Sequence, residues 1–241
     1  MTILTPQFKI FLQKRKDTLI KACPKKCQGA DLNCNCRKQF RFELQMAEAN
    51  IPYKYWYLTT EDDYVGEGKP KEKVMAYINK LDQAKEKGIG LYLAGSNGVG
   101  KTMFGCEILK AALRKGYTAK FFMMDEIVSM LTDSWYDEKA RAKFHNEILN
   151  VDFLYIDDSG KEFKSKTSTL VDSTFDKMFR NRANELLPTI ISSNEKPEGG
   201  TQTYGQSVLS LFYEHLIIVT FRGKDYRKEN ISPDLEKDLF A

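Results

Sequence analysis

The feature that most constrains the fold is a glycine-rich segment between a short apolar run, residues 91–94, and a stretch of helical periodicity. In order, it reads Gly95, Ser96, Asn97, Gly98, Val99, Gly100, Lys101 and Thr102. This spacing, after a strand and at the start of a helix, is typical of loops whose backbone N–H groups surround phosphate oxygens. The sequence therefore predicts that this segment binds a nucleotide, with Lys101 on the β- and γ-phosphates and Thr102 on Mg²⁺.

A second apolar run, residues 153–156, leads into Asp157 and Asp158. Ligands of open α/β sheets bind at the carboxyl ends of the strands, so both carboxylates should lie beside the phosphate loop if the two strands are neighbours. Asp157 would then hold Mg²⁺ through water, and Asp158 would orient and deprotonate the attacking water. A solvated acidic turn at the end of the strand is the alternative interpretation.

Asn194 follows another apolar run, residues 188–192, and is expected at the same edge of the sheet. There its side chain would contact the attacking water or the γ-phosphate. Asn after a strand is also common as a simple turn residue, so this hypothesis depends on the other two motifs.

Beyond residue 88, short apolar runs alternate with segments of helical periodicity. We expect strands at residues 91–94, 119–124, 153–156, 189–192 and 216–221, with helices between them. Such alternation predicts an α/β fold, a five-stranded parallel sheet with helices on both faces.

Four of the five cysteines fall within fourteen residues. They are Cys23, Cys27, Cys34 and Cys36. A chain without a secretory signal stays in a reducing compartment, where such a cluster favours a tetrahedral zinc site over disulfides. Free thiols or a redox pair are the alternatives, because the spacing is looser than in the commonest zinc knuckle. The fifth, Cys106, lies in an apolar helical run and is expected in the core.

The chain divides into three expected parts: a helical, zinc-binding domain at residues 1–50, a linker at 51–70 and a nucleotide-binding domain at 71–241. Helices are expected at residues 39–50 and 71–87, with the Pro- and Gly-containing segment between them as the linker.

Charge is distributed unevenly along the chain. Residues 1–42 contain ten Lys or Arg against two Asp, whereas the remainder has a slight excess of acidic residues. This basic N-terminal segment is either a solvated face or a contact surface for an acidic protein or a phosphate backbone.

With 42% hydrophobic and 29% charged residues, the composition excludes a disordered or collagen-like chain. Without a long apolar run or a signal-peptide core, a soluble, cytoplasmic protein is expected.

Taken in order, the phosphate loop, the segment Ile-Asp-Asp-Ser-Gly-Lys-Glu at 156–162 and the segment Pro-Thr-Ile-Ile-Ser-Ser-Asn at 188–194 resemble known motifs. They are similar to those of the DnaC/DnaI helicase loaders and the related IstB transposition ATPases, members of the AAA+ group. Residues 49–52 and 221–227 extend the likeness over nearly the whole chain. The cysteines resemble the zinc-binding N-terminal region of many Gram-positive and phage loaders, which IstB proteins typically lack. This resemblance favours a loader of a bacterial cell, encoded by the host or by a phage.

The resemblance implies an ATP-dependent protein that binds the hexameric, DnaB-type replicative helicase and delivers it to single-stranded DNA at replication initiation. It also implies an AAA+ core, ATP or ADP, Mg²⁺ and Zn²⁺ as cofactors, Asn194 as the first sensor, and Arg227 as a nucleotide contact. The arginine that family members place on a neighbour's ATP is replaced by Leu211, so we expect weak ATP hydrolysis, with Arg222 or Arg180 as substitutes. Residues 222–241 are too few for a full lid domain, and self-assembly on the helicase would close the site.

Two other functions remain open from sequence. One is an IstB-like ATPase that regulates a transposase on double-stranded DNA, and the other is a structural adaptor with a vestigial phosphate loop. Single-stranded DNA binding would need exposed aromatic side chains with basic neighbours. Among the candidates, Trp135 and Tyr136 are open to this role, whereas Phe121 and Phe122 are expected in the core.

Overall fold

The computed structural model describes residues 5–159, 168–197 and 201–226, with side chains described outside 168–174 and 201–206. Its centre is a parallel sheet with the strand order β2-β3-β4-β1-β5. The strands are β1 (Gly90–Ala94), β2 (Ala119–Met123), β3 (Phe153–Ser159), β4 (Thr189–Ser193) and β5 (Leu216–Thr220). The expected five-stranded parallel sheet is therefore confirmed, with each strand close to its predicted position.

Side chains of the central strands alternate between two hydrophobic layers. On β1, Leu91 and Leu93 join the layer beneath one set of helices, whereas Tyr92 and Ala94 join the layer on the opposite face. All five residues of this strand are buried. Burial on both faces is typical of parallel sheets and explains why the strands read as continuous apolar runs.

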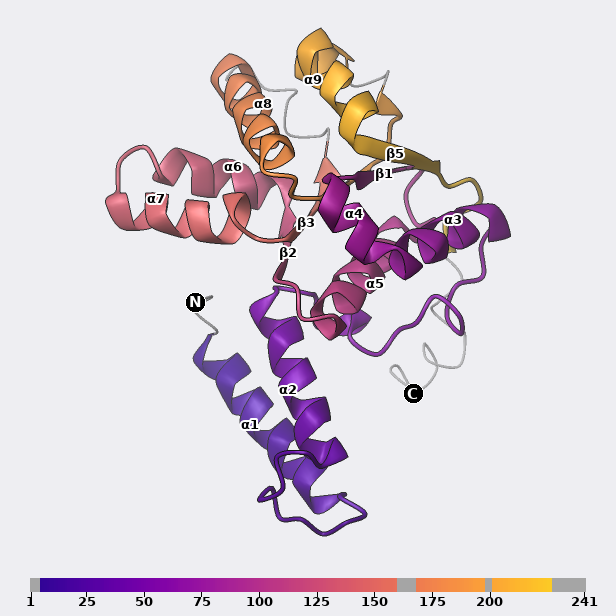
Figure 1. The fold of residues 1–241 in the computed structure, drawn as a ribbon, viewed down its shortest axis with the longest axis vertical. Helices are drawn as coiled ribbons and strands as arrows, with labels where there is room; N and C mark the ends of the chain where they lie inside the picture. Colours follow the sequence, from indigo (N-terminus) through magenta and orange to yellow (C-terminus); the bar gives the residue numbers. More distant parts are fainter. Residues whose placement is uncertain (1–4, 160–167, 198–200, 227–241) are drawn as a thin grey trace, which may run out of the picture.

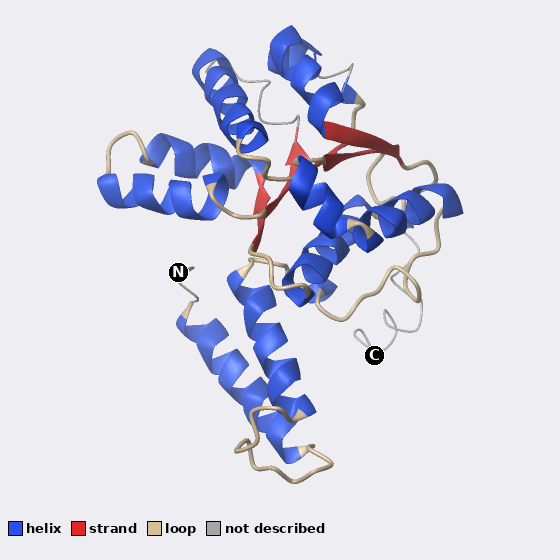
Figure 2. Cartoon of the chain, in the orientation of Figure 1, coloured by secondary structure: helices blue, strands red, loops and turns tan. Residues whose placement is uncertain are grey.

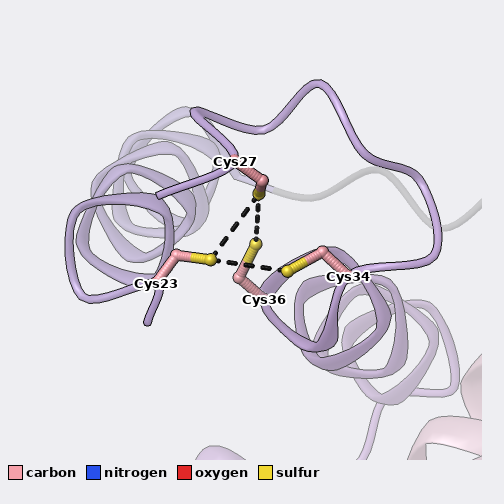
Figure 3. A group of neighbouring side chains, drawn as sticks. All are labelled: Cys23, Cys27, Cys34 and Cys36. Atoms are coloured by element: carbon pink, nitrogen blue, oxygen red, sulfur yellow. Dashed lines mark hydrogen bonds between the residues drawn. The ribbon is translucent and has the colours of Figure 1, made fainter. Parts of the chain in front are cut away.

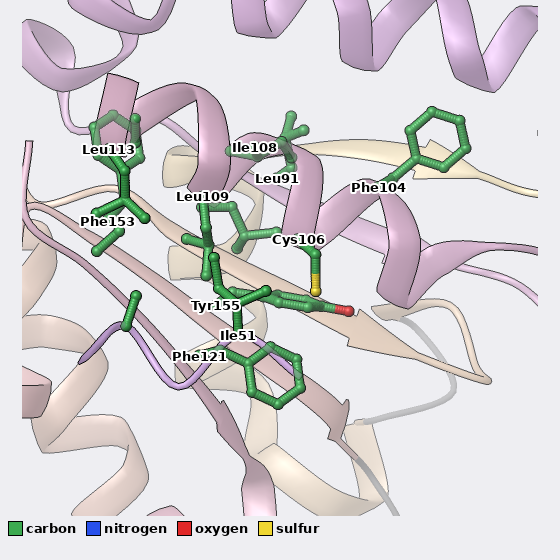
Figure 4. Packing of buried hydrophobic residues seen from close by; sticks show 14 of the residues in the cluster. Ile51, Leu91, Phe104, Cys106, Ile108, Leu109, Leu113, Phe121, Phe153 and Tyr155 are labelled. Carbon is green, nitrogen blue, oxygen red and sulfur yellow. The ribbon is translucent and has the colours of Figure 1, made fainter. Parts of the chain in front are cut away.

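Helices cover both faces of the sheet (Figures 1 and 2). One face carries α3 (Gly68–Asn79), α4 (Leu81–Lys87) and α5 (Lys101–Arg114). The other carries α6 (Met124–Asp133), α7 (Glu138–Phe144), the π-helical turn η2 (His145–Leu149), α8 (Ser168–Asn184) and α9 (Thr201–His215). Figure 4 shows α5 against the sheet, with Cys106 and Leu109 packed beside Tyr155, so the expectation that Cys106 is a core residue is confirmed.

Two helices, α1 (Pro6–Lys21) and α2 (Asn35–Glu48), form an arm that projects from the sheet domain (Figure 1). Helix α1, which the sequence did not predict, begins with Pro6 and is capped by Thr5, whose hydroxyl accepts a hydrogen bond from the Phe8 N–H. The loop with the cysteines lies at the far end of the arm. At the near end, Leu12 and Met46 join the same buried layer as α5, so one hydrophobic core continues from the arm into the sheet domain.

Several element boundaries differ from those expected. The helix predicted at 71–87 is two helices, because Lys80 leaves helical geometry with φ −114° and ψ 24°. Helix α2 begins at Asn35, four residues earlier than predicted and immediately after Cys34, the first cysteine of the second pair. Within the described ranges, no helix is long and apolar enough to cross a membrane.

Candidate functional site

The phosphate loop joins β1 to α5 in left-handed turns that only glycine adopts easily. Gly98 has φ 75° and Gly100 has φ 98°. The ammonium of Lys101, the first residue of α5, is folded back over the loop. It donates to the carbonyl oxygens of Gly95 (2.7 Å) and Ser96 (2.8 Å) and to Asn194 Oδ1 (3.0 Å). Because these are hydrogen bonds to neutral acceptors, an incoming phosphate would provide a stronger partner for this charge.

The acidic pair lies inside β3, not beyond its end as predicted. Asp157 is buried and has the same strand parity as Tyr155, which places its carboxylate on the α5 face of the sheet. Its Oδ1 accepts hydrogen bonds from the Tyr155 hydroxyl (2.7 Å) and the Ser192 hydroxyl. Ser192 Oγ in turn accepts the N–H of Asp158 (3.1 Å). One serine of β4 therefore fixes both aspartates.

A β-bulge displaces Asp158 from the regular strand. Between Ile156 and Ser159 the register of β3 against β4 shifts, and Asp158 has the positive φ of 55°. A bulge redirects the side chain of the extra residue, which is common next to active sites. Here it allows the two consecutive carboxylates to line the same cavity instead of opposite faces of the sheet.

The two strands that carry the main motifs are not neighbours. β4 lies between β1 and β3, so the condition under which we placed the carboxylates beside the phosphate loop is wrong. The groups nevertheless meet, because the ends of all three strands open onto one cavity of about 450 Å³. We call this the acidic cavity; Lys101, Thr102, Asp157, Asp158 and Asn194 are among its lining residues.

A second cavity, of about 420 Å³, lies on the other side of the phosphate loop. We call it the tyrosine cavity; it is lined by Tyr55, Tyr64, Val65, Gly98, Val99, Gly100 and Tyr226, among others. Four residues line both cavities: Lys54, Tyr55, Lys101 and Thr102. The two cavities therefore meet beside the phosphate loop, so a nucleotide bound at the loop can extend from one into the other.

The ring of Tyr64 packs edge-on against Phe104, with 4.7 Å between centroids. Burial, with the nearby Tyr226 and Glu67, raises the pKa of Tyr64 to about 12. Its hydroxyl is a buried atom for which no hydrogen-bond partner exists in the described chain. Such an atom favours a ligand that supplies a polar partner, as the edge of a nucleotide base does.

The structure thus brings together most of the residues predicted from sequence, and it adds Lys54, Tyr55, Tyr64 and Ser192. The residues predicted from sequence were found by the spacing of glycines and by their position at the ends of strands. The additions come from irregular segments or from inside a strand, where no short pattern marks them. Arg227 lies outside the described residues.

Leu211 stands where the resemblance places the inter-subunit arginine of family members, and that assignment stays a prediction. Leu211, on α9, packs against the hydrophobic layer beneath α8. Of the suggested substitutes, Arg180 pairs with Asp176 (3.0 Å) on its own helix, and Arg222 is exposed.

The four cysteines at the end of the arm converge on one point (Figure 3). Cys23 follows α1, Cys34 caps α2, and all four sulfur atoms lie within 4.8 Å of one another. The separations are 3.4 Å for Cys23–Cys34, 3.4 Å for Cys27–Cys36 and 3.6 Å for Cys23–Cys27. Sulfur atoms about 2.3 Å from a tetrahedral zinc ion are roughly 3.8 Å apart, so the cluster needs little movement to hold one.

The pKa values of Cys23 and Cys36 differ because the contacts of their thiols differ. Hydrogen bonds from the Cys27 backbone and the Cys34 thiol lower the pKa of Cys23 to about 6. Burial, with hydrogen bonds among the other thiols, raises the pKa of Cys36 to about 12. A group of thiols that shares protons in this way, without a disulfide, has the donor chemistry of a thiolate metal site.

Comparison with known proteins agrees with this geometry. The family model described as "IstB-like ATP binding protein" matches residues 31–232. The replicative helicase loader DnaI of Bacillus subtilis (strain 168) is 35% identical over 112 residues, which are 46% of this chain and 35% of DnaI. The matched part is thus about a third of the length of that curated relative.

Solved structures show the same fold. The crystal structure of the DnaC helicase loader is similar with a TM-score of 0.62 and 25% identity, over 71% of this chain and 100% of that one. A DnaI crystal structure has a TM-score of 0.59 and 21% identity, over 71% of this chain and 94% of that one. The sheet domain therefore has the AAA+ P-loop fold, and the chain belongs to the family of IstB-like ATP binding proteins.

Proposed function

We propose that this protein is an ATP-dependent helicase loader, which binds a hexameric, DnaB-type replicative helicase and delivers it to single-stranded DNA. The observation that carries the proposal is the acidic cavity, where Lys101, Asp157, Asp158 and Asn194 surround one space beside the phosphate loop. The likeness of the chain to DnaI and to the DnaC helicase loader supports this function over other uses of a P-loop.

Each group at the cavity has a chemical task. The backbone of residues 95–100 and the Lys101 ammonium hold the phosphates, and the Asp158 carboxylate orients and accepts a proton from the attacking water. The Asn194 Oδ1 accepts from Lys101, and the amide N–H of the same side chain would donate to the γ-phosphate or the water. Thr102 and Asp157 line the same cavity and fit Mg²⁺, which would supply charge neutralisation at the phosphates. The Asp157 hydrogen bonds from Tyr155 and Ser192 keep its carboxylate oriented.

ATP hydrolysis should be weak in this protein alone. In related sites an arginine from a neighbouring subunit stabilises the charge that develops on the transferred phosphoryl group, with effects of about 10³–10⁵ on rate. Leu211 provides no such charge. ATP then acts mainly as a bound ligand that sets the conformation of the loader. Slow hydrolysis determines how long that conformation lasts.

The arm is the proposed helicase contact. Zinc bound by Cys23, Cys27, Cys34 and Cys36 would tie the end of α1 to the start of α2 and so hold the arm rigid. The arm's excess of Lys and Arg favours an acidic surface on the partner.

Single-stranded DNA binding is proposed at the turn between α6 and α7. Trp135 is 40% exposed and Tyr136 is 88% exposed, with their ring centroids 6.5 Å apart. Arg141 and Lys177 line a cavity beside Trp135. Exposed aromatic rings with cationic neighbours stack bases without sequence preference. By contrast, Phe121 and Phe122 are each 5% exposed, which confirms their expected place in the core.

Co-purification with a hexameric replicative helicase, followed by native mass spectrometry, tests the function. The full chain should form a complex whose stability changes with ATP, and Lys101→Ala should remove the dependence on ATP but not the binding. Absence of any complex with helicases from several bacteria and phages would contradict the proposal.

An IstB-like role with a transposase remains the second candidate, because the family model that matches most of the chain carries that name. It predicts ATP-dependent filaments on double-stranded DNA, which electron microscopy of the protein with duplex DNA would detect. The cysteine cluster has no evident task in that function.

A further inference from the structure

Two residues outside the phosphate loop lie where the two cavities meet. Lys54 and Tyr55 line both cavities, as Lys101 and Thr102 do. The latter two belong to the phosphate loop, whereas Lys54 and Tyr55 belong to the short 3₁₀ helix η1 (Tyr53–Tyr55) that follows the arm. A nucleotide that extends from the tyrosine cavity into the acidic cavity therefore passes between these two pairs. This argument rests on the proposed ATP-dependent function.

The segment around η1 is fixed to the phosphate-loop helix by a buried lysine. Lys110, on α5, is 2% exposed. Its ammonium donates to the carbonyl oxygens of Tyr55 (3.1 Å) and Leu58 and pairs with Glu107 Oε2 (2.7 Å). A buried charge with several partners holds its neighbours in one arrangement. The backbone next to Lys54 is thus held against α5, since Tyr55, whose carbonyl accepts from Lys110, directly follows Lys54.

Charge at the cavity favours a second cation. Three carboxylates, those of Glu126, Asp157 and Asp158, line the acidic cavity together with the Lys101 ammonium. A polyphosphate adds several negative charges. Lys54 is exposed, and its Nζ lies 4.8 Å from the centroid of the Tyr55 ring, a weak contact that a phosphate oxygen can replace.

We propose that Lys54 is a second phosphate-binding lysine, which contacts the nucleotide from the segment that connects the arm to the sheet domain. The same turn of chain also contacts the arm. Tyr53 packs on Phe11 of α1 (5.0 Å between centroids) and on Trp56 (5.2 Å). Because η1 contacts both the nucleotide site and α1, we expect phosphate binding by Lys54 to alter the packing of Tyr53 and Trp56 against the arm.

The affinity of the full chain for Mg·ADP and for a non-hydrolysable Mg·ATP analogue, measured by titration calorimetry, tests the contact. Lys54→Ala should weaken binding of the ATP analogue about tenfold, which equals about 1.4 kcal/mol. Lys54→Arg should largely restore it. The matched control is Lys69→Ala, on α3, which removes an equally exposed lysine that lines neither cavity.

Wild-type affinity in Lys54→Ala, or an equal loss in Lys69→Ala, overturns the proposal. If the wild-type chain binds neither nucleotide, both this inference and the ATP site fail, whereas the helicase contact fails only if co-purification also fails.

The fluorescence of Trp56 tests the link to the arm. The chain has two tryptophans, and Trp135→Phe leaves the buried Trp56 as the reporter. Saturating ATP analogue should change its emission in the Trp135→Phe protein but not when Lys54→Ala is added. An equal change in both proteins would contradict the proposed transmission through Lys54.

Discussion

Gly98 and Gly116 provide a pair of substitutions that separates nucleotide binding from backbone strain. Both glycines have left-handed backbones, with φ 75° and 89°. A Cβ at Gly98 would lie 1.6 Å from Asp225 Oδ1 and 3.0 Å from Asp225 Cα, whereas a Cβ at Gly116 would meet nothing within 4 Å. Both alanine variants therefore carry the same backbone cost, about 1–2 kcal/mol of stability, but only one disturbs the site.

At Gly98 the added Cβ displaces the Asp225 side chain, and its approach to Asp225 Cα also requires the backbone beside Tyr226 to shift by a few tenths of an ångström. The Tyr226 N–H donates to the Gly98 carbonyl oxygen (3.3 Å), and its ring lines the tyrosine cavity. Loss of one aromatic face against a nucleotide base costs about 1–3 kcal/mol. We therefore expect Gly98→Ala to weaken nucleotide binding by about tenfold or more, while Gly116→Ala binds as the wild type does.

Titration calorimetry with Mg·ADP measures the affinity, and thermal unfolding without nucleotide measures the shared backbone cost. Wild-type affinity in both variants would refute the assignment of the tyrosine cavity to the nucleotide. A loss of affinity in Gly116→Ala as large as in Gly98→Ala would show that backbone strain, not the cavity, governs binding.

The remaining predictions concern the arm and the core. The purified protein should contain about one zinc per chain, and Cys23→Ser should lower that content in elemental analysis; an unchanged content would contradict the thiolate site. Arg182→Met should lower the free energy of unfolding by about 3 kcal/mol or more, because the fully buried guanidinium donates to four backbone carbonyls and a threonine hydroxyl. Arg180→Met, which removes a half-exposed ion pair on the same helix, should cost less than about 1 kcal/mol; equal losses in urea unfolding would refute the difference. Burial and the Glu43 carboxylate raise the pKa of Tyr57 from 10.0 to about 12, so the folded state keeps a proton that the unfolded state loses, and stability should fall between pH 10 and 12, less steeply in Tyr57→Phe.

The parts of this site that the sequence predicted are those with local causes. The phosphate loop needs glycine where φ is positive, and the strands are continuous apolar runs because helices cover both faces. Both requirements appear within a few residues of sequence. The aspartates and Asn194 were located for the same reason, as polar residues at the ends of such runs.

Long-range pairing determined what the sequence did not reveal. The position of β4 between β1 and β3, and the bulge that turns Asp158, depend on contacts between segments far apart in the chain. Helix α1 escaped prediction because only Leu12 is buried along it, so its apolar periodicity is weak. Lys54 and Tyr64 enter the site from segments with little regular structure, which carry no periodic signal.

The shared core also affects how the arm can be tested. Leu12, Met46 and Trp56 belong to the same buried cluster as Phe104 of the phosphate-loop helix. Removal of the arm would therefore expose apolar surface beside the candidate nucleotide site and alter more than the proposed helicase contact. Substitutions in the full chain are the better test, and the division at residues 50 and 70 remains a prediction.

Helicase retention on closed circular single-stranded DNA tests the proposed loader function most directly. A DNA circle has no end that can pass through the helicase, so the helicase ring must open to enclose the strand. The helicase would be mixed with the circle, this protein and ATP, and the amount retained after a high-salt wash would be measured. We predict salt-resistant retention that requires this protein and is lost with Lys101→Ala. Retention that is the same with and without this protein, or no retention together with ATP-dependent filaments on duplex DNA, would contradict the loader function.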